Sequence, residues 1–134
     1  MRRFHLIFGL LLFIGFVLTG QYMDKFHQHL AGMSDGPRML YRSRHIYILL
    51  SAMLHLGLGV YFSYRPDKLR QTLQLLGSLL ITVASLLFVY AFFQEPMMTN
   101  LYTPYSRKGI FMLVSGTALH LFASINSKQM SDTL

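Results

Sequence analysis

The sequence predicts an all-α integral membrane protein, a four-helix bundle made of two tandem helical hairpins. Of its 134 residues, 53% are hydrophobic and only 13% are charged, whereas about a quarter are charged in an ordinary soluble domain. The charged residues are clustered, which leaves four long apolar runs without the period-two alternation of barrel strands. Because only helices and closed barrels can cross lipid, these runs predict four membrane-spanning helices.

Composition also excludes several classes of protein. The chain contains no cysteine, so disulfides, thiolate metal sites and cysteine nucleophiles are absent. Its net charge of +7 is spread over separate connections, which favours contact with anionic lipid head groups over nucleic-acid binding. The sequence has no phosphate-binding glycine loop, no Ser-His-Asp set and no HExxH motif. We therefore expect neither a hydrolase nor a phosphoryl-transfer enzyme.

The first hairpin is predicted to consist of spans 3–22 and 44–64. The first span follows two arginines but lacks a small-x-small cleavage pattern, so it is expected to remain uncleaved. Its length is about the ~20 residues that a bilayer core requires. A short interfacial helix is expected at 24–31 in the connection between the two spans. This connection should break any long helix because of Gly32, Gly36 and Pro37.

The second hairpin is predicted to consist of spans 69–93 and 109–125, followed by a polar tail at 126–134. Lysine and arginine are divided six against six between the two sides of the membrane, so the positive-inside rule does not decide the orientation. The two N-terminal arginines and the basic turn before the third span favour a cytoplasmic N-terminus. We expect a bacterial inner membrane protein that contacts the lipid bilayer and joins a larger membrane complex or a homo-oligomer.

The second and fourth spans resemble each other. Each begins with a Ser-Arg pair, at Ser43-Arg44 and at Ser106-Arg107, and each carries a Leu-His-Leu sequence around His55 or His120. Spans one and three correspond more faintly, so the two hairpins are predicted to be a parallel internal repeat about an axis along the membrane normal.

His55 and His120 are the candidate site. They lie eleven residues after Arg44 and thirteen after Arg107, which places both roughly 16–20 Å below one interface, near the bilayer centre. An ionisable residue at that depth is a functional-site hypothesis by default. Small residues share the helix face of each histidine, and they leave room for a flat ligand or for close backbone contact: Ser51, Gly59, Gly116 and Ser124.

Three interpretations of this pair remain open. Two neutral imidazoles on facing helices are what axial ligation of haem b requires, with Arg44 and Arg107 approaching the propionates. The same pair could handle a quinone or protons. Alternatively, each histidine hydrogen-bonds a hydroxyl of span three across the helix interface. The first two make the chain an electron-transfer protein, architecturally similar to small haem-b membrane cytochromes and anchor subunits. The third makes it a non-catalytic accessory subunit or assembly factor.

The other ionisable groups suggest weaker sites. His27 and His29 with Asp24 could hold a metal, but a His-x-His pair alone is weak evidence and a solvated interfacial loop is the favoured interpretation. His5 and His45 are predicted to be interfacial residues. Asp24 and Glu95 are predicted to form salt bridges within their own hairpins.

Overall fold

The computed structural model describes residues 1–98 and 100–125 and forms four α-helices there, with no strand in this part of the chain. The helices are α1 (Arg2–His27), α2 (Asp35–Tyr61), α3 (Lys68–Gln94) and α4 (Pro104–Ser124), and 3-10 turns η1 (Gln28–Leu30) and η2 (Glu95–Met97) follow α1 and α3. The predicted all-α class is confirmed. The predicted polar tail at 126–134 lies outside the described residues.

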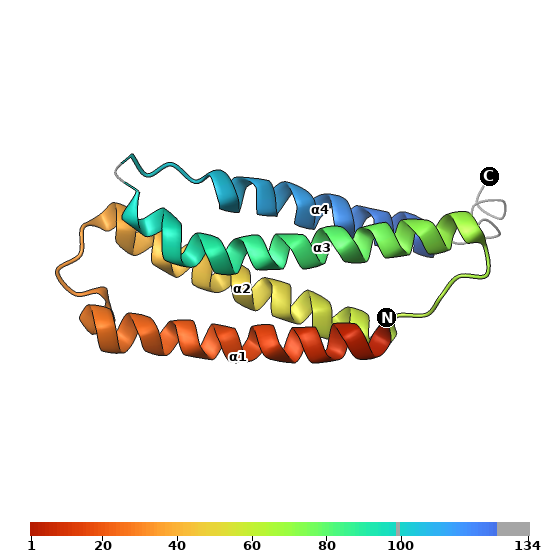
Figure 1. Cartoon of the computed structure of the whole chain (residues 1–134), viewed down its shortest axis with the longest axis horizontal. Coiled ribbons are helices and arrows are strands. Elements are labelled where there is room, and N and C mark those ends of the chain that lie inside the picture. The colour runs from red at the N-terminus through yellow and green to blue at the C-terminus, as the bar shows by residue number, and fades with distance from the viewer. Residues whose placement is uncertain (99, 126–134) are drawn as a thin grey trace.

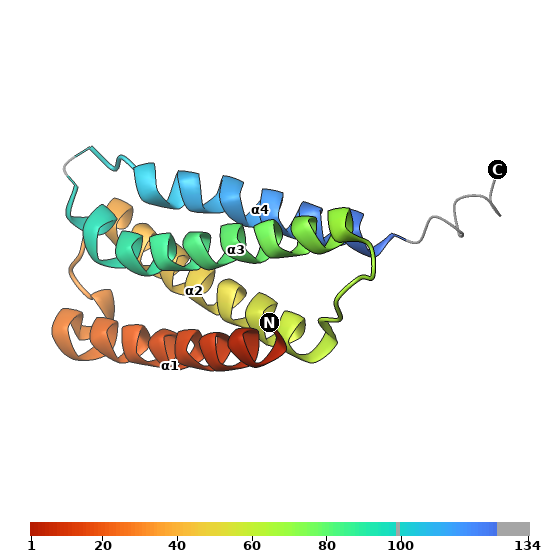
Figure 2. The same ribbon diagram turned by 45° about the vertical axis from the view of Figure 1, so that its right-hand side comes forward.

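The helices form two antiparallel hairpins. α1 packs along α2, α3 packs along α4, and α2 packs against α3 to join them. α1 and α4 therefore lie at opposite edges, with α2 and α3 between them (Figures 1 and 2). The start of α1, the ends of α2 and α4 and the start of α3 meet at one end of the bundle, which is called the N-terminal end below.

The first connection is shorter than the sequence predicts. α1 continues to His27, so the separate interfacial helix expected at 24–31 is not formed. α2 begins at Asp35 and contains Gly36 and Pro37 within its first turn. Proline is tolerated there because the first helical amides have no intrahelical acceptor to lose.

The buried core lies mainly between α2 and α3 and is built from aromatic and β-branched side chains: Tyr41, Ile48, Ile81, Phe88 and Phe92. The outer face of α1 is apolar but exposed, with Ile7 at 62% and Leu11 at 59%. Two helical segments are long and apolar enough to cross a membrane, Arg2–Leu30 and Lys68–Met97. Exposed apolar surface of this extent is unfavourable in water and favourable in lipid.

Candidate functional site

A hydrogen-bonded chain of four side chains crosses the interior at the N-terminal end of the bundle. His55 Nδ1 lies 2.8 Å from His5 Nδ1, His5 Nε2 lies 3.0 Å from Ser78 Oγ, and the same Oγ lies 3.1 Å from His120 Nε2. Each of the four helices contributes one member. We refer to these four residues as the histidine–serine chain.

The histidine–serine chain is enclosed by aromatic rings. His5 and His55 are fully buried and Ser78 is 1% exposed. The Phe8 ring centroid lies 4.7 Å from that of His55, and the Phe62 centroid lies 5.8 Å from that of His5. Since buried polar groups are costly without partners, mutual hydrogen bonding stabilises three imidazoles in this apolar setting.

The hydrogen bonds of the histidine–serine chain can point in either of two directions, from His55 toward His120 or from His120 toward His55. A neutral imidazole donates through one ring nitrogen and accepts through the other, and a serine hydroxyl does both. If His55 donates to His5, the serine hydroxyl donates to His120 Nε2, and the His120 proton is on Nδ1. If the direction reverses, His120 donates through Nε2 and its Nδ1 becomes an acceptor. Reversal therefore changes what His120 offers to a ligand.

His5 was predicted to be a plain interfacial residue, but it is fully buried inside the bundle. It is one of the two inner members of the histidine–serine chain, because it bonds both His55 and Ser78. A signal in the sequence could have found it. The buried residues of α1 follow each other at spacings of three, four and seven, which places them on one helix face: His5, Gly9, Leu12 and Thr19. Of the two histidines singled out from the sequence, His120 bonds a hydroxyl of span three, that of Ser78, whereas His55 bonds His5 instead.

The structure brings His55 and His120 to the same end of the bundle but not into direct contact. His5 and Ser78 lie between them along the chain. The Phe62 centroid is also 5.9 Å from that of His120, so a haem between the two histidines would have to displace these side chains. His55 lies six residues before the end of α2 and His120 four before the end of α4. At ~1.5 Å per residue, both are within about 10 Å of the helix ends.

The small residues beside the histidines hold helices close together. A Cβ at Gly59 would lie 2.5 Å from Leu6 Cγ of α1, and a Cβ at Gly116 would lie 2.7 Å from the Gly77 oxygen of α3. Of the two uses expected for these residues, the structure shows close helix contact. Ser51 is fully buried, and its Oγ has no hydrogen-bond partner among the described residues.

Phe8-Gly9-Leu10-Leu11 of span one corresponds to Leu76-Gly77-Ser78-Leu79 of span three, and each of these two glycines lies close to one of the two histidines. A Cβ at Gly9 would lie 3.1 Å from His55 Cβ, and one at Gly77 would lie 2.9 Å from His120 Cδ2. This equivalence agrees with the proposed internal repeat, which stays a prediction.

The two arginines have different surroundings at the opposite end of the bundle. Arg44 is 5% exposed, and its Nε donates to Glu95 Oε2 at 2.6 Å. Glu95 Oε1 also accepts the backbone N–H groups of Tyr105 and Ser106 at 2.9 and 2.8 Å, so this carboxylate caps α4. Arg107 is exposed. Arg44 is thus already paired with a carboxylate, far along α2 from His55.

Of the two acidic residues predicted to pair within their own hairpins, Asp24 does so and Glu95 does not. Glu95 belongs to the second hairpin and pairs with Arg44 of the first, so its salt bridge joins the hairpins rather than closing its own. Asp24 Oδ1 lies 2.7 Å from His29 Nε2 on the surface of the first connection. Among the described residues, no group of three side chains is placed to hold a metal ion there or elsewhere.

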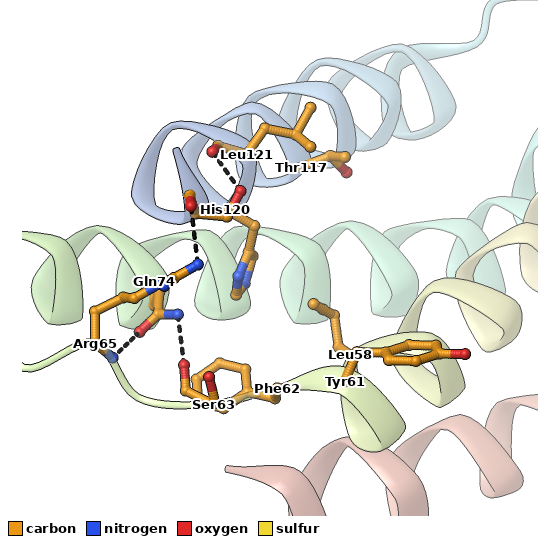
Figure 3. A pocket seen from close by; sticks show the side chains of 10 residues that line it. Leu58, Tyr61, Phe62, Ser63, Arg65, Gln74, Thr117, His120 and Leu121 are labelled. Carbon is orange, nitrogen blue, oxygen red and sulfur yellow. Dashed lines mark hydrogen bonds between the residues drawn. The ribbon is translucent and has the colours of Figure 1, made fainter. Parts of the chain in front are cut away.

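A pocket of about 240 Å³ lies beside His120, between the end of α2 and α4 (Figure 3). Leu58, Phe62 and Leu121 provide apolar walls. At its outer side Arg65 Nη2 donates to the Ser124 oxygen at 2.8 Å, and Gln74 Nε2 donates to the Ser63 oxygen at 2.9 Å. We call this the head-group pocket. Because Ser78 occupies His120 Nε2, Nδ1 is the ring nitrogen left for a ligand.

Comparison of the chain with protein-family models, with curated proteins and with solved structures gave no match. Its function is therefore inferred from the geometry of this site.

Proposed function

We propose that the protein is a small integral membrane protein that binds a quinone between α2 and α4, with His120 as the hydrogen-bond partner of the quinone head group. One observation carries this proposal. His120 is at once the end of the buried histidine–serine chain and part of the wall of the head-group pocket. A ligand in that pocket is thereby connected through hydrogen bonds to the two buried imidazoles of His5 and His55.

The shape and chemistry of the head-group pocket suit a quinone ring. A quinone is planar and apolar, with two opposed carbonyl acceptors, and ligand pockets of this kind combine apolar walls with a few placed polar groups. Leu58 and Phe62 offer the apolar surface and His120 the polar contact. A larger cofactor such as haem is less compatible, since the space between His55 and His120 contains His5, Ser78 and Phe62.

The two directions of the histidine–serine chain match the two redox forms of the ligand. With its proton on Nδ1, His120 donates to a quinone carbonyl. With the chain reversed, Nδ1 accepts from a quinol hydroxyl. The same pocket can therefore hold both forms. Reversal shifts one proton across each of the three hydrogen bonds, and it balances when a proton enters at His55 Nε2 and another leaves at His120 Nδ1.

The outward apolar faces support the proposed placement in a membrane. α1 and α3 each have the length and composition to cross a bilayer, and α2 and α4 pack along them as the remaining spans of a four-helix membrane bundle. With a cytoplasmic N-terminus, the head-group pocket opens on the cytoplasmic side of a bacterial inner membrane. The pocket then lies at the depth where head groups meet the hydrocarbon layer.

Calorimetry on the protein in phosphatidylcholine nanodiscs tests the proposal, with a benzoquinone that carries one isoprene unit as the probe. We expect saturable binding, weakened about two- to tenfold by His120→Ala because one net hydrogen bond is lost. His45→Ala is the matched control. His45 is also half-buried, and it bonds Thr19 at 2.9 Å on the opposite side of the bundle from α4. Absent binding, or equal weakening by both substitutions, would refute the proposal.

A second function is favoured by the way the histidine–serine chain joins all four helices. Such a network could serve only to fasten α1 and α4, which share few other contacts, in a non-catalytic accessory subunit or assembly factor. In that case the His120 variant loses stability, and the wild-type protein binds no quinone.

A further inference from the structure

A second cavity, of about 310 Å³, lies directly beside the head-group pocket along α2 and α4. Thr117 and Leu121 line both cavities. The other side chains of this cavity are apolar: Leu54, Leu113, Val114 and Ala118. We call it the lateral groove.

The lateral groove and the head-group pocket lie end to end and share the side chains of Thr117 and Leu121, and together we call them the trough. On α2, Leu54 and Leu58 lie four residues apart on one helix face, and Phe62 follows directly after the end of α2. On α4, the lining residues run from Leu113 to Ser124 at helical spacing, a length of about 16 Å. The trough thus extends from the helix ends toward the middle of the bundle.

Polarity changes along the trough in one direction. Arg65, Gln74 and Ser63 stand at the outer end, His120 comes next, and the inner part is bounded by leucine, valine and alanine. The groove opens sideways, because Val114 and Leu121 are each 62% exposed and α1 lies at the opposite edge of the bundle (Figure 2). An amphipathic ligand with a ring head and an apolar tail matches this order of surfaces.

We infer that the lateral groove holds the isoprenoid tail of the quinone whose head group binds beside His120, which makes the ligand a long-chain membrane quinone. This inference rests on the proposed function. One ligand can occupy both cavities, because Thr117 and Leu121 line the lateral groove as well as the head-group pocket. An acyl chain of a phospholipid is the rival occupant.

Ala118→Phe tests the inference, because Ala118 lines the lateral groove but not the head-group pocket. Binding of three probes is measured in phosphatidylcholine nanodiscs: a tailless benzoquinone and the same head group with one and with two isoprene units. We expect Ala118→Phe to weaken binding of the tailed probes at least about fivefold, the effect of overpacking a filled site. Binding of the tailless probe should be unchanged.

Val17→Phe is the matched control, since Val17 is 44% exposed on α1 and lies away from α4. It adds the same ring to an exposed apolar position and should leave the binding of all three probes unchanged. Because partition of the probes into lipid is the same for both variants, a difference between the variants reports binding to the protein. Val114→Trp gives a second way to fill the groove if Ala118→Phe unfolds, as judged by helical circular dichroism.

The outcomes separate the two proposals. If no probe binds, the proposed function fails. If the tailless and tailed probes bind equally tightly, or if Ala118→Phe weakens all three alike, quinone binding stands and the tail assignment is overturned. If native mass spectrometry shows a bound phospholipid that Ala118→Phe removes while quinone binding is unchanged, the rival occupant is correct.

Discussion

Arg44 and Glu95 form a buried ion pair that joins the two hairpins, with Nε and Oε2 2.6 Å apart and side-chain exposures of 6% and 0%. The same carboxylate accepts the first free amides of α4 from Tyr105 and Ser106. A single side chain in η2 therefore fixes α2, η2 and the start of α4 relative to one another.

We predict that Glu95→Gln destabilises the protein by about 3 kcal/mol, because it leaves the Arg44 guanidinium buried without a counter-charge. Thermal unfolding in detergent, followed by circular dichroism, measures the change. Asp35→Asn is the control, since the Asp35 side chain is fully exposed in its pair with Arg38, and it should leave the melting curve unaltered. Arg44→Met combined with Glu95→Gln should cost less than the two single changes added together. Strict additivity would show that the pair is not coupled.

His5→Ala is expected to lower stability by roughly 2–4 kcal/mol, since it opens a cavity and removes partners from two other buried groups. His29→Ala serves as the comparison because that side chain is 82% exposed. The histidine–serine chain adds a second readout. Loss of His5 should alter the ¹⁵N chemical shifts of the His120 ring, although the two residues are joined only through Ser78. An unchanged His120 tautomer would show that the hydrogen bonds of the histidine–serine chain do not couple His120 to His5.

The sequence was sufficient for the number of helices, because four apolar runs are separated by polar connections that contain proline or glycine. It was not sufficient for the partners of the ionisable residues. His5 stands one turn from a pair of arginines and so resembles an interfacial residue, and only the crossing of α1 over α2 and α3 buries it. Glu95 belongs to the second hairpin in the sequence, which suggests a partner in that hairpin. The packing of α2 on α3 instead brings Arg44 of the first hairpin into contact with it. Helix packing, which apolar composition does not determine, decided both cases.

The glycine contact between α3 and α4 predicts a sharp difference between two alanine substitutions. Gly116→Ala should destabilise the protein by about 1–3 kcal/mol, because the new Cβ would meet the Gly77 oxygen at 2.7 Å and force the helices apart. Gly15 on α1 has nothing within 4 Å of its Cβ position. Gly15→Ala should therefore be neutral or raise stability by up to about 1 kcal/mol through its better helix propensity. Chemical unfolding in detergent micelles compares the two, and equal effects would contradict this account of the contact.

Haem binding by His55 and His120 gives the last prediction. The His55 Nδ1 is bonded to His5, and the Phe62 ring lies within 6 Å of both His5 and His120 by ring centroid, so we expect no bis-imidazole haem between α2 and α4. Protein purified in mild detergent from haem-replete cells should lack a Soret band in its visible spectrum. A Soret band with a reduced α-band that disappears in both His55→Ala and His120→Ala, but persists in His45→Ala, would replace the quinone proposal with a cytochrome. A band that persists in all three variants would indicate haem bound outside this site.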